Sequence, residues 1–365
     1  MVVVLCLVPV ARWFVPKLKS LFSARYSGCT VRLRMAGNMW KFFIRLAPVF
    51  EIMAVLMLGT VVDMLWRALS LPIYIFSPGL FVVFFSAYGL RRKYGNWRWG
   101  DFGLRRLKTF KETVLYGVMG LAIVEIIIAV PLILMAPQLL QIGSSLLGGF
   151  KDIPMPDFLL YATLGALFIA AVYAAIPEEI QYRGYMQGLT SKYMGKPWAV
   201  LMIALMFMVV HCYSGYTSGY IPMVLMLFPS SLMFGVLYQK TGSLYPSMVM
   251  HFLGDFLVLI PVGLYVKEYY TLAYLLTPIY LVASLVIIYF QKERAKELVR
   301  ETIILLKGLK TDREAISVGV VSLASLILII PAMEYLKGAS IVLTGSIAAL
   351  LILLTIFGWR RQKRE

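Results

Sequence analysis

An all-α membrane protein is the fold class that this sequence predicts, and three observations predict it. Of the 365 residues, 61% are hydrophobic and only 15% are charged, whereas a soluble domain carries about 25% charged residues. The apolar residues come in runs of about 20, the length that crosses a hydrocarbon core of about 30 Å as a helix. The basic residues gather in alternate connecting segments, as the positive-inside bias of membrane proteins requires.

Apolar runs bounded by charged or turn residues predict a polytopic bundle of about ten membrane helices. They cover residues 47 to 66, 72 to 90, 113 to 136, 158 to 182, 197 to 213, 221 to 238, 244 to 264, 271 to 290, 315 to 335 and 339 to 358. If the N-terminus lies inside and the crossings alternate, 31 of the 35 basic residues fall in inward segments. Only Arg67, Lys151, Lys267 and Lys337 fall elsewhere. This bias predicts that the N and C termini are both inside.

These spans divide the chain into four predicted parts. Residues 1 to 46 are a basic N-terminal extension, and residues 47 to 290 are a core of eight membrane helices. Residues 291 to 314 mix basic, acidic and apolar residues as an amphipathic cytoplasmic linker would, and residues 315 to 365 hold two additional membrane helices and a basic tail. The apolar run at the start of the extension lacks a preceding basic stretch, so a cleaved signal peptide is not expected.

Composition also excludes several classes of protein. The net charge of +17 lies in the loops, as membrane topology predicts, so nucleic acid is not an expected partner. Three cysteines, Cys6, Cys29 and Cys212, build neither a disulfide framework nor a thiolate metal site. We expect an integral membrane protein with lipid as its partner, in the plasma membrane of a prokaryote or in the ER membrane of a eukaryote.

Ionisable groups inside a membrane are costly, so each is a functional hypothesis. Both histidines of the chain, His211 and His251, fall in predicted spans. A simpler interpretation is that each bridges two helices by hydrogen bonds. Of the acids outside the motifs, Glu51 and Asp63 are expected near headgroup water at opposite ends of the first span, and Glu125 is expected to bond a neighbouring helix.

The run from Pro177 to Arg183 places two adjacent carboxylates before a guanidinium. Glu179 and Arg183 are four residues apart and share a helix face, so they can pair, while Glu178 points about 100° away. A poorly solvated carboxylate beside a neutralised one is a candidate general base. Pro177 cannot donate a backbone hydrogen bond to the carbonyl of Tyr173 and should kink the helix just before the pair. Alone, the run would fit an interfacial ion pair at a helix end better than a catalytic site.

Helix spacing brings His211 to the same depth as Glu178. Gly195 and Pro197 mark a turn at about residue 194. Glu178 lies 16 residues before residue 194 and His211 lies 17 residues after it. An antiparallel hairpin therefore sets both about 25 Å from the turn, at about 1.5 Å per residue. On the seventh span, His251 and Asp255 are four residues apart and form a second polar pair on one face.

Three motifs in this order resemble the type II CAAX prenyl endopeptidases, also called the CPBP or Abi intramembrane proteases. The motifs are Glu178-Glu179-x-x-x-Arg183, Phe207-x-x-x-His211 and His251-x-x-x-Asp255. The resemblance implies a hydrolase with a catalytic cluster that it assigns residue by residue: Glu178, Glu179, Arg183, His211, His251 and Asp255. Glu178 with His211 would activate water, His251 and Asp255 would face the oxyanion, and Glu179 with Arg183 would hold the helix geometry. Family members often carry Asn at the position of Asp255.

The implied substrate is a membrane-associated peptide or protein, with or without a prenyl group. Eukaryotic members trim prenylated CAAX proteins, and prokaryotic members are linked to the maturation of small peptides or immunity toward them. The cofactor is left open. Glu178, His211 and His251 offer three zinc ligands with a free position for water, which would make a metalloprotease, and the same residues can work without metal.

Two other functions compete with the protease. In an ion- or proton-coupled transporter, Glu51, Asp63, Glu125 and the histidines would be ligands, but the polar residues have no matching set in a second half of the chain. A non-catalytic peptide-binding immunity protein would keep the motifs and dispense with their chemistry. Other intramembrane proteases fit poorly, because the chain has no His-Glu-x-x-His and no Gly-x-Ser-x-Gly.

Overall fold

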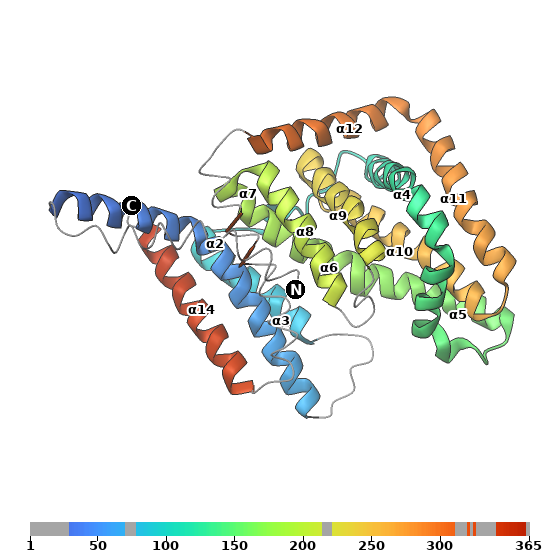
Figure 1. Cartoon of the computed structure of the whole chain (residues 1–365), viewed down its shortest axis with the longest axis horizontal. Coiled ribbons are helices and arrows are strands. Elements are labelled where there is room, and N and C mark those ends of the chain that lie inside the picture. The colour runs from blue at the N-terminus through green and yellow to red at the C-terminus, as the bar shows by residue number, and fades with distance from the viewer. Residues whose placement is uncertain are drawn as a thin grey trace. The chain divides into compact units, whose positions relative to one another are not determined.

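The computed structural model describes residues 29–69, 78–213, 221–310, 320–321, 324–325 and 341–362 (Figure 1). Every regular element in these ranges is a helix, so the all-α prediction is confirmed for this part of the chain. The chain divides into two units, Met1–Ile44 and Arg45–Glu365. The candidate site and the helices that carry it lie in the second unit.

Most of the helices in the described ranges are α-helical. In chain order the elements are α2 (Cys29–Ala68), α3 (Pro78–Gly95), η1 (Trp99–Phe102), α4 (Phe110–Leu147), η2 (Gly148–Phe150), α5 (Met155–Phe168), η3 (Ile169–Ala175), α6 (Ile176–Glu179), η4 (Ile180–Gln187), α7 (Gly188–Met194), α8 (Lys196–Tyr213), α9 (Ile221–Thr241), α10 (Tyr245–Val266), α11 (Tyr270–Phe290), α12 (Lys292–Lys307), η5 (Gly308–Lys310) and α14 (Ile341–Gln362). Of these, η3 and η4 are π-helices, and η1, η2 and η5 are 3₁₀ turns.

Five helices among the described residues have the length and composition to cross a membrane. They are Leu46–Trp66, Phe110–Leu134, Met155–Met194, Tyr245–Val266 and Tyr270–Phe290, and they coincide with the first, third, fourth, seventh and eighth predicted spans. Two further predicted spans correspond to shorter apolar helices, at Lys196–His211 and Val342–Ile356. The span predicted at 315 to 335 lies almost entirely outside the described residues. The count of ten and the orientation of the termini therefore stay predictions.

The fourth membrane helix is longer than the sequence predicts. We expected a span over 158 to 182, and the structure has one helical run of 40 residues, Met155–Met194. It continues past Arg183, as the hairpin argument requires, and ends at Gly195, whose φ of 80° is a conformation that glycine adopts without steric cost. α8 starts at the next residue. The turn predicted near residue 194 is confirmed.

Local sequence explains where α4 starts and how the segment before it is held. Thr109 caps α4, because its side chain accepts a hydrogen bond from the Glu112 backbone N–H at 3.1 Å. The preceding segment turns at Gly103 with a φ of 82°, and a Cβ there would lie 2.5 Å from the Tyr238 ring. The Gly103 carbonyl accepts a hydrogen bond from the Leu244 N–H at 2.9 Å, which ties this segment to the start of α10.

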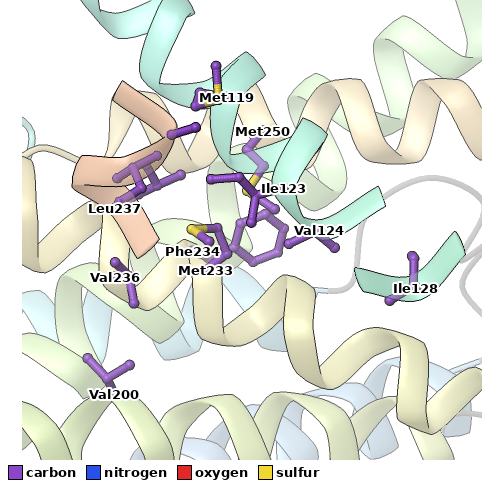
Figure 2. Close-up of a cluster of buried hydrophobic side chains, with 12 residues drawn as sticks. Met119, Ile123, Val124, Ile128, Val200, Met233, Phe234, Val236, Leu237 and Met250 are labelled. Atoms are coloured by element: carbon purple, nitrogen blue, oxygen red, sulfur yellow. The ribbon is translucent and has the colours of Figure 1, made fainter. Parts of the chain in front are cut away.

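One hydrophobic cluster joins α4, α8, α9, α10 and α12 (Figure 2). Its buried members are Met119, Ile123, Val124, Ile128, Val200, Met233, Phe234, Val236, Leu237, Met250, Ala295 and Leu298. Figure 2 shows Phe234 and Met250 close to Ile123 of α4. Phe234 belongs to this cluster and also contacts the polar site described in the next subsection. The cluster therefore forms one apolar side of that site.

Candidate active site

The two adjacent glutamates lie on α6, a single α-helical turn between two π-helical segments. η3 covers the seven residues before this turn and η4 the eight residues after it. Pro177 is in the first turn of α6 and has no N–H to donate, so the regular α-helical pattern cannot pass through it. π-helical segments flank Pro177 within one continuous helical run, and the kink expected there stays a prediction. π-helical turns occur frequently at functional sites.

Glu179 and Arg183 form the ion pair that their spacing predicts. The Arg183 Nη1 lies 3.0 Å from the Glu179 Oε1, and both side chains are fully buried. Arg183 also donates from Nη2 to the Ser231 hydroxyl at 2.7 Å and to the Ser231 carbonyl at 3.2 Å. Because a buried charge without a partner is costly, these contacts bind η4 firmly to α9.

Glu178 faces two histidines that come from two other helices. Its Oε2 lies 4.0 Å from the Nε2 of His211 on α8 and 3.9 Å from the Nε2 of His251 on α10. The same Oε2 is buried and has no hydrogen-bond partner among the residues that the structure describes. Separations of about 4 Å are too long for a direct hydrogen bond.

Each histidine is oriented through its other ring nitrogen. The Nδ1 of His211 lies 2.8 Å from the Phe207 carbonyl oxygen, and the Nδ1 of His251 lies 3.0 Å from the Glu179 Oε1. A carbonyl or an ionised carboxylate only accepts, so both Nδ1 atoms carry a hydrogen. In the neutral rings both Nε2 atoms are then acceptors, and both are directed toward Glu178.

Asp255 completes the set of six residues from the three motifs. Its Oδ2 lies 3.6 Å from the His251 Nε2, one helical turn further along α10. The six candidate residues thus form one chain of contacts. His251 meets Glu178, Glu179 and Asp255, while Glu178 meets His211 and Glu179 meets Arg183.

Two aromatic rings line the cluster, and one of them escaped the sequence analysis. Phe207 packs on His211 with ring centroids 4.2 Å apart. Phe234 of α9 stacks on His251 with centroids 4.8 Å apart, and the Arg183 guanidinium lies over both phenylalanine rings at 4.7 and 4.8 Å. Phe234 and Ser231 carry no ionisable group and belong to no motif, so no sequence signal pointed to them.

A second buried polar cluster corrects the interpretation of Glu51. We expected Glu51 near headgroup water, but its side chain is fully buried and paired with Arg91 of α3. It also accepts a hydrogen bond from the Tyr185 hydroxyl at 2.9 Å and one from the Trp359 Nε1 at 2.6 Å. The cluster therefore joins α2, α3, η4 and α14. Asp63 accepts a hydrogen bond from the Gly79 N–H at 2.9 Å.

The zinc arrangement considered from the sequence is not formed. Within the described ranges, no group of three or more His, Cys, Asp or Glu side chains is arranged to hold a metal ion. Glu178, His211 and His251 converge, but a tetrahedral zinc site requires every ligand atom to lie about 2.0 to 2.2 Å from one common metal position. The three side chains are not arranged around such a position.

The fold and the site define an integral membrane protein of helical class with a glutamate and histidine cluster between its helices. Residues 160–257 match the family model described as Type II CAAX prenyl endopeptidase Rce1-like, which confirms the resemblance that the three motifs indicated. The matched residues are about a quarter of the chain and include all six candidates. This family indicates an intramembrane protease of CAAX type. No curated protein and no solved structure matches the chain.

Proposed function

We propose that this protein is an intramembrane endopeptidase in which Glu178 activates the water that attacks the scissile carbonyl. The observation that carries the proposal is the position of the Glu178 Oε2. It is buried, lacks a hydrogen-bond partner among the described residues and lies 3.9 to 4.0 Å from two histidine Nε2 atoms. A water held among these three atoms has a carboxylate to take its proton.

The hydrolysis assigns a part to each side chain. Glu178 takes a proton from the water while the water oxygen bonds to the carbonyl carbon, and His211 orients that water from the other side through its Nε2. The carbonyl oxygen becomes an oxyanion, which needs a donor in the transition state. His251 and Asp255 are placed to donate to it when protonated. Collapse of the intermediate breaks the C–N bond, and the proton on Glu178 passes to the leaving amine.

Glu179 and Arg183 act through His251. The Glu179 Oε1 accepts a hydrogen bond from the His251 Nδ1 at 3.0 Å, and Arg183 holds that same oxygen at 3.0 Å. Since Ser231 and the two phenylalanine rings hold Arg183, the direction of the His251 ring is determined by packed, buried groups. Such preorganisation is what keeps a donor aligned with a developing charge.

The substrate that suits this site is a membrane-associated peptide or protein segment. Five of the six residues lie on helices of membrane-spanning length, and His211 ends a shorter apolar helix, so the scissile bond must reach the cluster from the bilayer or its surface. A prenyl group would hold a substrate there, and an apolar peptide would partition there as well. The four residues assigned to the reaction, Glu178, His211, His251 and Asp255, act on the peptide bond and its water, and they do not choose between these substrates.

The test is cleavage by the purified protein of a fluorogenic peptide ending in a farnesylated CAAX sequence, beside the same peptide without the lipid. Glu178→Gln should lower the rate by at least about 100-fold, the usual effect of losing a general base. Glu125→Gln, which changes a carboxylate in another predicted membrane span, outside the candidate site, is the matched control and should cleave at the parent rate.

Each outcome of this experiment is informative. Normal cleavage by Glu178→Gln would sink the proposal. Binding of the peptide without cleavage by the parent protein would favour the non-catalytic immunity protein. A chelator added to the parent protein tests metal dependence directly, and unchanged cleavage in its presence is the expected result.

A further inference from the structure

α12 presents two different faces, and only one of them is used by the rest of the described protein. It begins two residues after α11 ends, and it runs above one end of α9 and α4 instead of continuing α11 (Figure 1). Ala295 and Leu298 are buried in the hydrophobic cluster with α4 and α9. This helix therefore lies against the end of the membrane bundle.

The acidic side chains of α12 are occupied by the protein. Lys240, at the end of α9, contacts Glu297 at 2.8 Å and Glu301 at 2.9 Å. The hydrogen bond from Lys240 lowers the pKa of Glu297, and the hydrogen bonds to both glutamates raise the pKa of Lys240. Tyr116 adds a hydrogen bond to Glu297 at 3.2 Å. Both acids thus have a partner within the fold.

The opposite flank of α12 is apolar and exposed. Val299, Ile303 and Leu306 are spaced by four and three residues and are 42%, 47% and 37% exposed, so they form one stripe along the helix. At 3.6 residues per turn the stripe is centred about 180° around the helix from Glu297 and Glu301. An exposed apolar stripe of this kind needs a partner.

Basic residues border this stripe. Four of them are exposed and lie within an arc of about 80° next to it: Lys292, Lys296, Arg300 and Lys307. Only Lys296 has an ion pair among them in the described part of the chain, at 3.0 Å from the exposed Glu293. With two of the helix's three glutamates held by Lys240, this face carries a net positive charge.

Exposed aromatic side chains mark the same end of the bundle. Tyr289 and Phe290, at the end of α11, are 75% and 74% exposed, and Phe110, at the start of α4, is 82% exposed. Aromatic residues are enriched where a membrane helix meets the headgroups. α12 follows directly after Tyr289 and Phe290, so it starts at the depth of the lipid headgroups.

We infer that α12 is a docking surface for the bilayer itself, with Val299, Ile303 and Leu306 inserted among the acyl chains and the adjacent basic residues bound to anionic lipid headgroups. An apolar stripe beside Lys and Arg is the pattern of a helix that lies in the interface plane. The occupant is a lipid surface, because the basic residues need negative charge and the stripe needs hydrocarbon along its full length. This inference does not rest on the proposed peptidase activity.

The experiment places an environment-sensitive fluorophore at Ile303→Cys in the full-length protein, with Cys6, Cys29 and Cys212 replaced by serine. The labelled protein is reconstituted in phosphatidylcholine bilayers with or without phosphatidylglycerol. Glu293→Cys, which is exposed on another side of the helix, carries the control label. In anionic bilayers the label at 303 should shift to shorter wavelength and be quenched by brominated acyl chains, while the label at 293 stays accessible to aqueous iodide.

Neutralising the basic border tests the electrostatic part. The triple change Lys296→Gln, Arg300→Gln and Lys307→Gln should reduce the ratio of inserted to exposed label in anionic bilayers, by a factor of roughly five for each lost charge. The same change should have little effect in phosphatidylcholine alone. Equal iodide access at 303 and 293 in anionic bilayers would overturn the inference. So would a label at 303 that is equally shielded in detergent and in both bilayers, since a protein segment would then cover the stripe.

Discussion

His251 is the residue at which the site converges. Three carboxylates surround its ring, with Glu179 at 3.0 Å from Nδ1 and Asp255 and Glu178 at 3.6 and 3.9 Å from Nε2. Glu178 and Glu179 already supply negative charge to the imidazole. The negative charge of Asp255 is therefore the least needed of the three. The distance from its Oδ2 to the His251 Nε2 is also longer than a hydrogen bond.

Asp255→Asn should keep the activity of the proposed enzyme and extend it to higher pH. If Asp255 helps to bind the oxyanion, it must be protonated, because an ionised carboxylate would repel a developing negative charge. An amide is a neutral donor at every pH. The rate of peptide cleavage as a function of pH, beside the parent, tests this.

Asp255→Leu is the matched variant, since it keeps the approximate volume and removes the donor, and its rate should fall. A fall in the cleavage rate of about 10-fold or more for Asp255→Asn at every pH would instead mean that the negative charge of Asp255 orients His251. The loss of a residue that orients a functional side chain typically has an effect of this size. That result would contradict the donor role.

Arg183 holds the site together through geometry as well as charge. It bonds Glu179 and Ser231 and stacks on Phe207 and Phe234. Arg183→Lys keeps the charge and loses the planar stacking and forked donors, so the thermal stability of the detergent-solubilised protein should fall. Arg183→Ala leaves Glu179 as an unpaired buried charge and should cost about 3 to 5 kcal/mol. Melting followed by fluorescence-detected gel filtration measures both, and an Arg183→Ala protein as stable as the parent would contradict the buried pair.

Among the helices, α14 has a role that the family match does not explain. It lies outside residues 160–257, yet its Trp359 donates to Glu51 at 2.6 Å and packs under Arg91, whose guanidinium lies 4.5 Å from the ring centroid. The Tyr185 hydroxyl reaches the same Glu51 from η4, two residues after Arg183. α14 thus shares a buried carboxylate with the helix that carries the candidate active site.

Trp359→Phe should destabilise the folded protein by about 1 to 3 kcal/mol, the cost of leaving a buried group without its hydrogen bond. The change retains an aromatic ring beside Arg91 and removes only the indole N–H from the Glu51 cluster. Trp99→Phe is the control, because Trp99 is 44% exposed and stacks on Tyr88 through its ring. Chemical unfolding in detergent compares the two, and equal stability of both variants would show that the Trp359 hydrogen bond contributes nothing.

At the scale of the whole molecule, orientation in the membrane depends on the loop charges. Of the 31 basic residues assigned to inward segments, Arg91 and Arg183 are buried in ion pairs and do not act as loop charges. The others still outnumber the four on the outward side, so the predicted inside location of both termini stands on the remaining asymmetry.

Cysteine labelling tests this orientation. In a cysteine-free background, Lys151→Cys should react with a membrane-impermeant maleimide added to the outside of intact cells, and Lys93→Cys should react only after permeabilisation. Both side chains are exposed, so a lack of reaction would reflect the side of the membrane. Reaction of Lys93→Cys alone from the outside would invert the topology.

The sequence alone determined the features that depend on spacing along one helix or one hairpin. Hydrophobic run length predicted five helices that the structure confirms, because the length of a membrane helix follows from the thickness of the bilayer. The four-residue spacing predicted the pair of Glu179 and Arg183. Equal distances from the turn at Gly195 brought Glu178 and His211 to one depth, where they lie 4.0 Å apart.

Only the tertiary structure decided how the helices are rotated about their axes and which neighbours they meet. That rotation brings Ser231 and Phe234 of α9 to Arg183 and His251, buries Glu51 against Trp359 from the far end of the chain, and turns the exposed stripe of α12 away from Lys240. Hydropathy carries no such information in a membrane helix, because its lipid-facing and protein-facing sides are both apolar. The partner of each buried polar group is therefore determined by packing between helices distant in sequence.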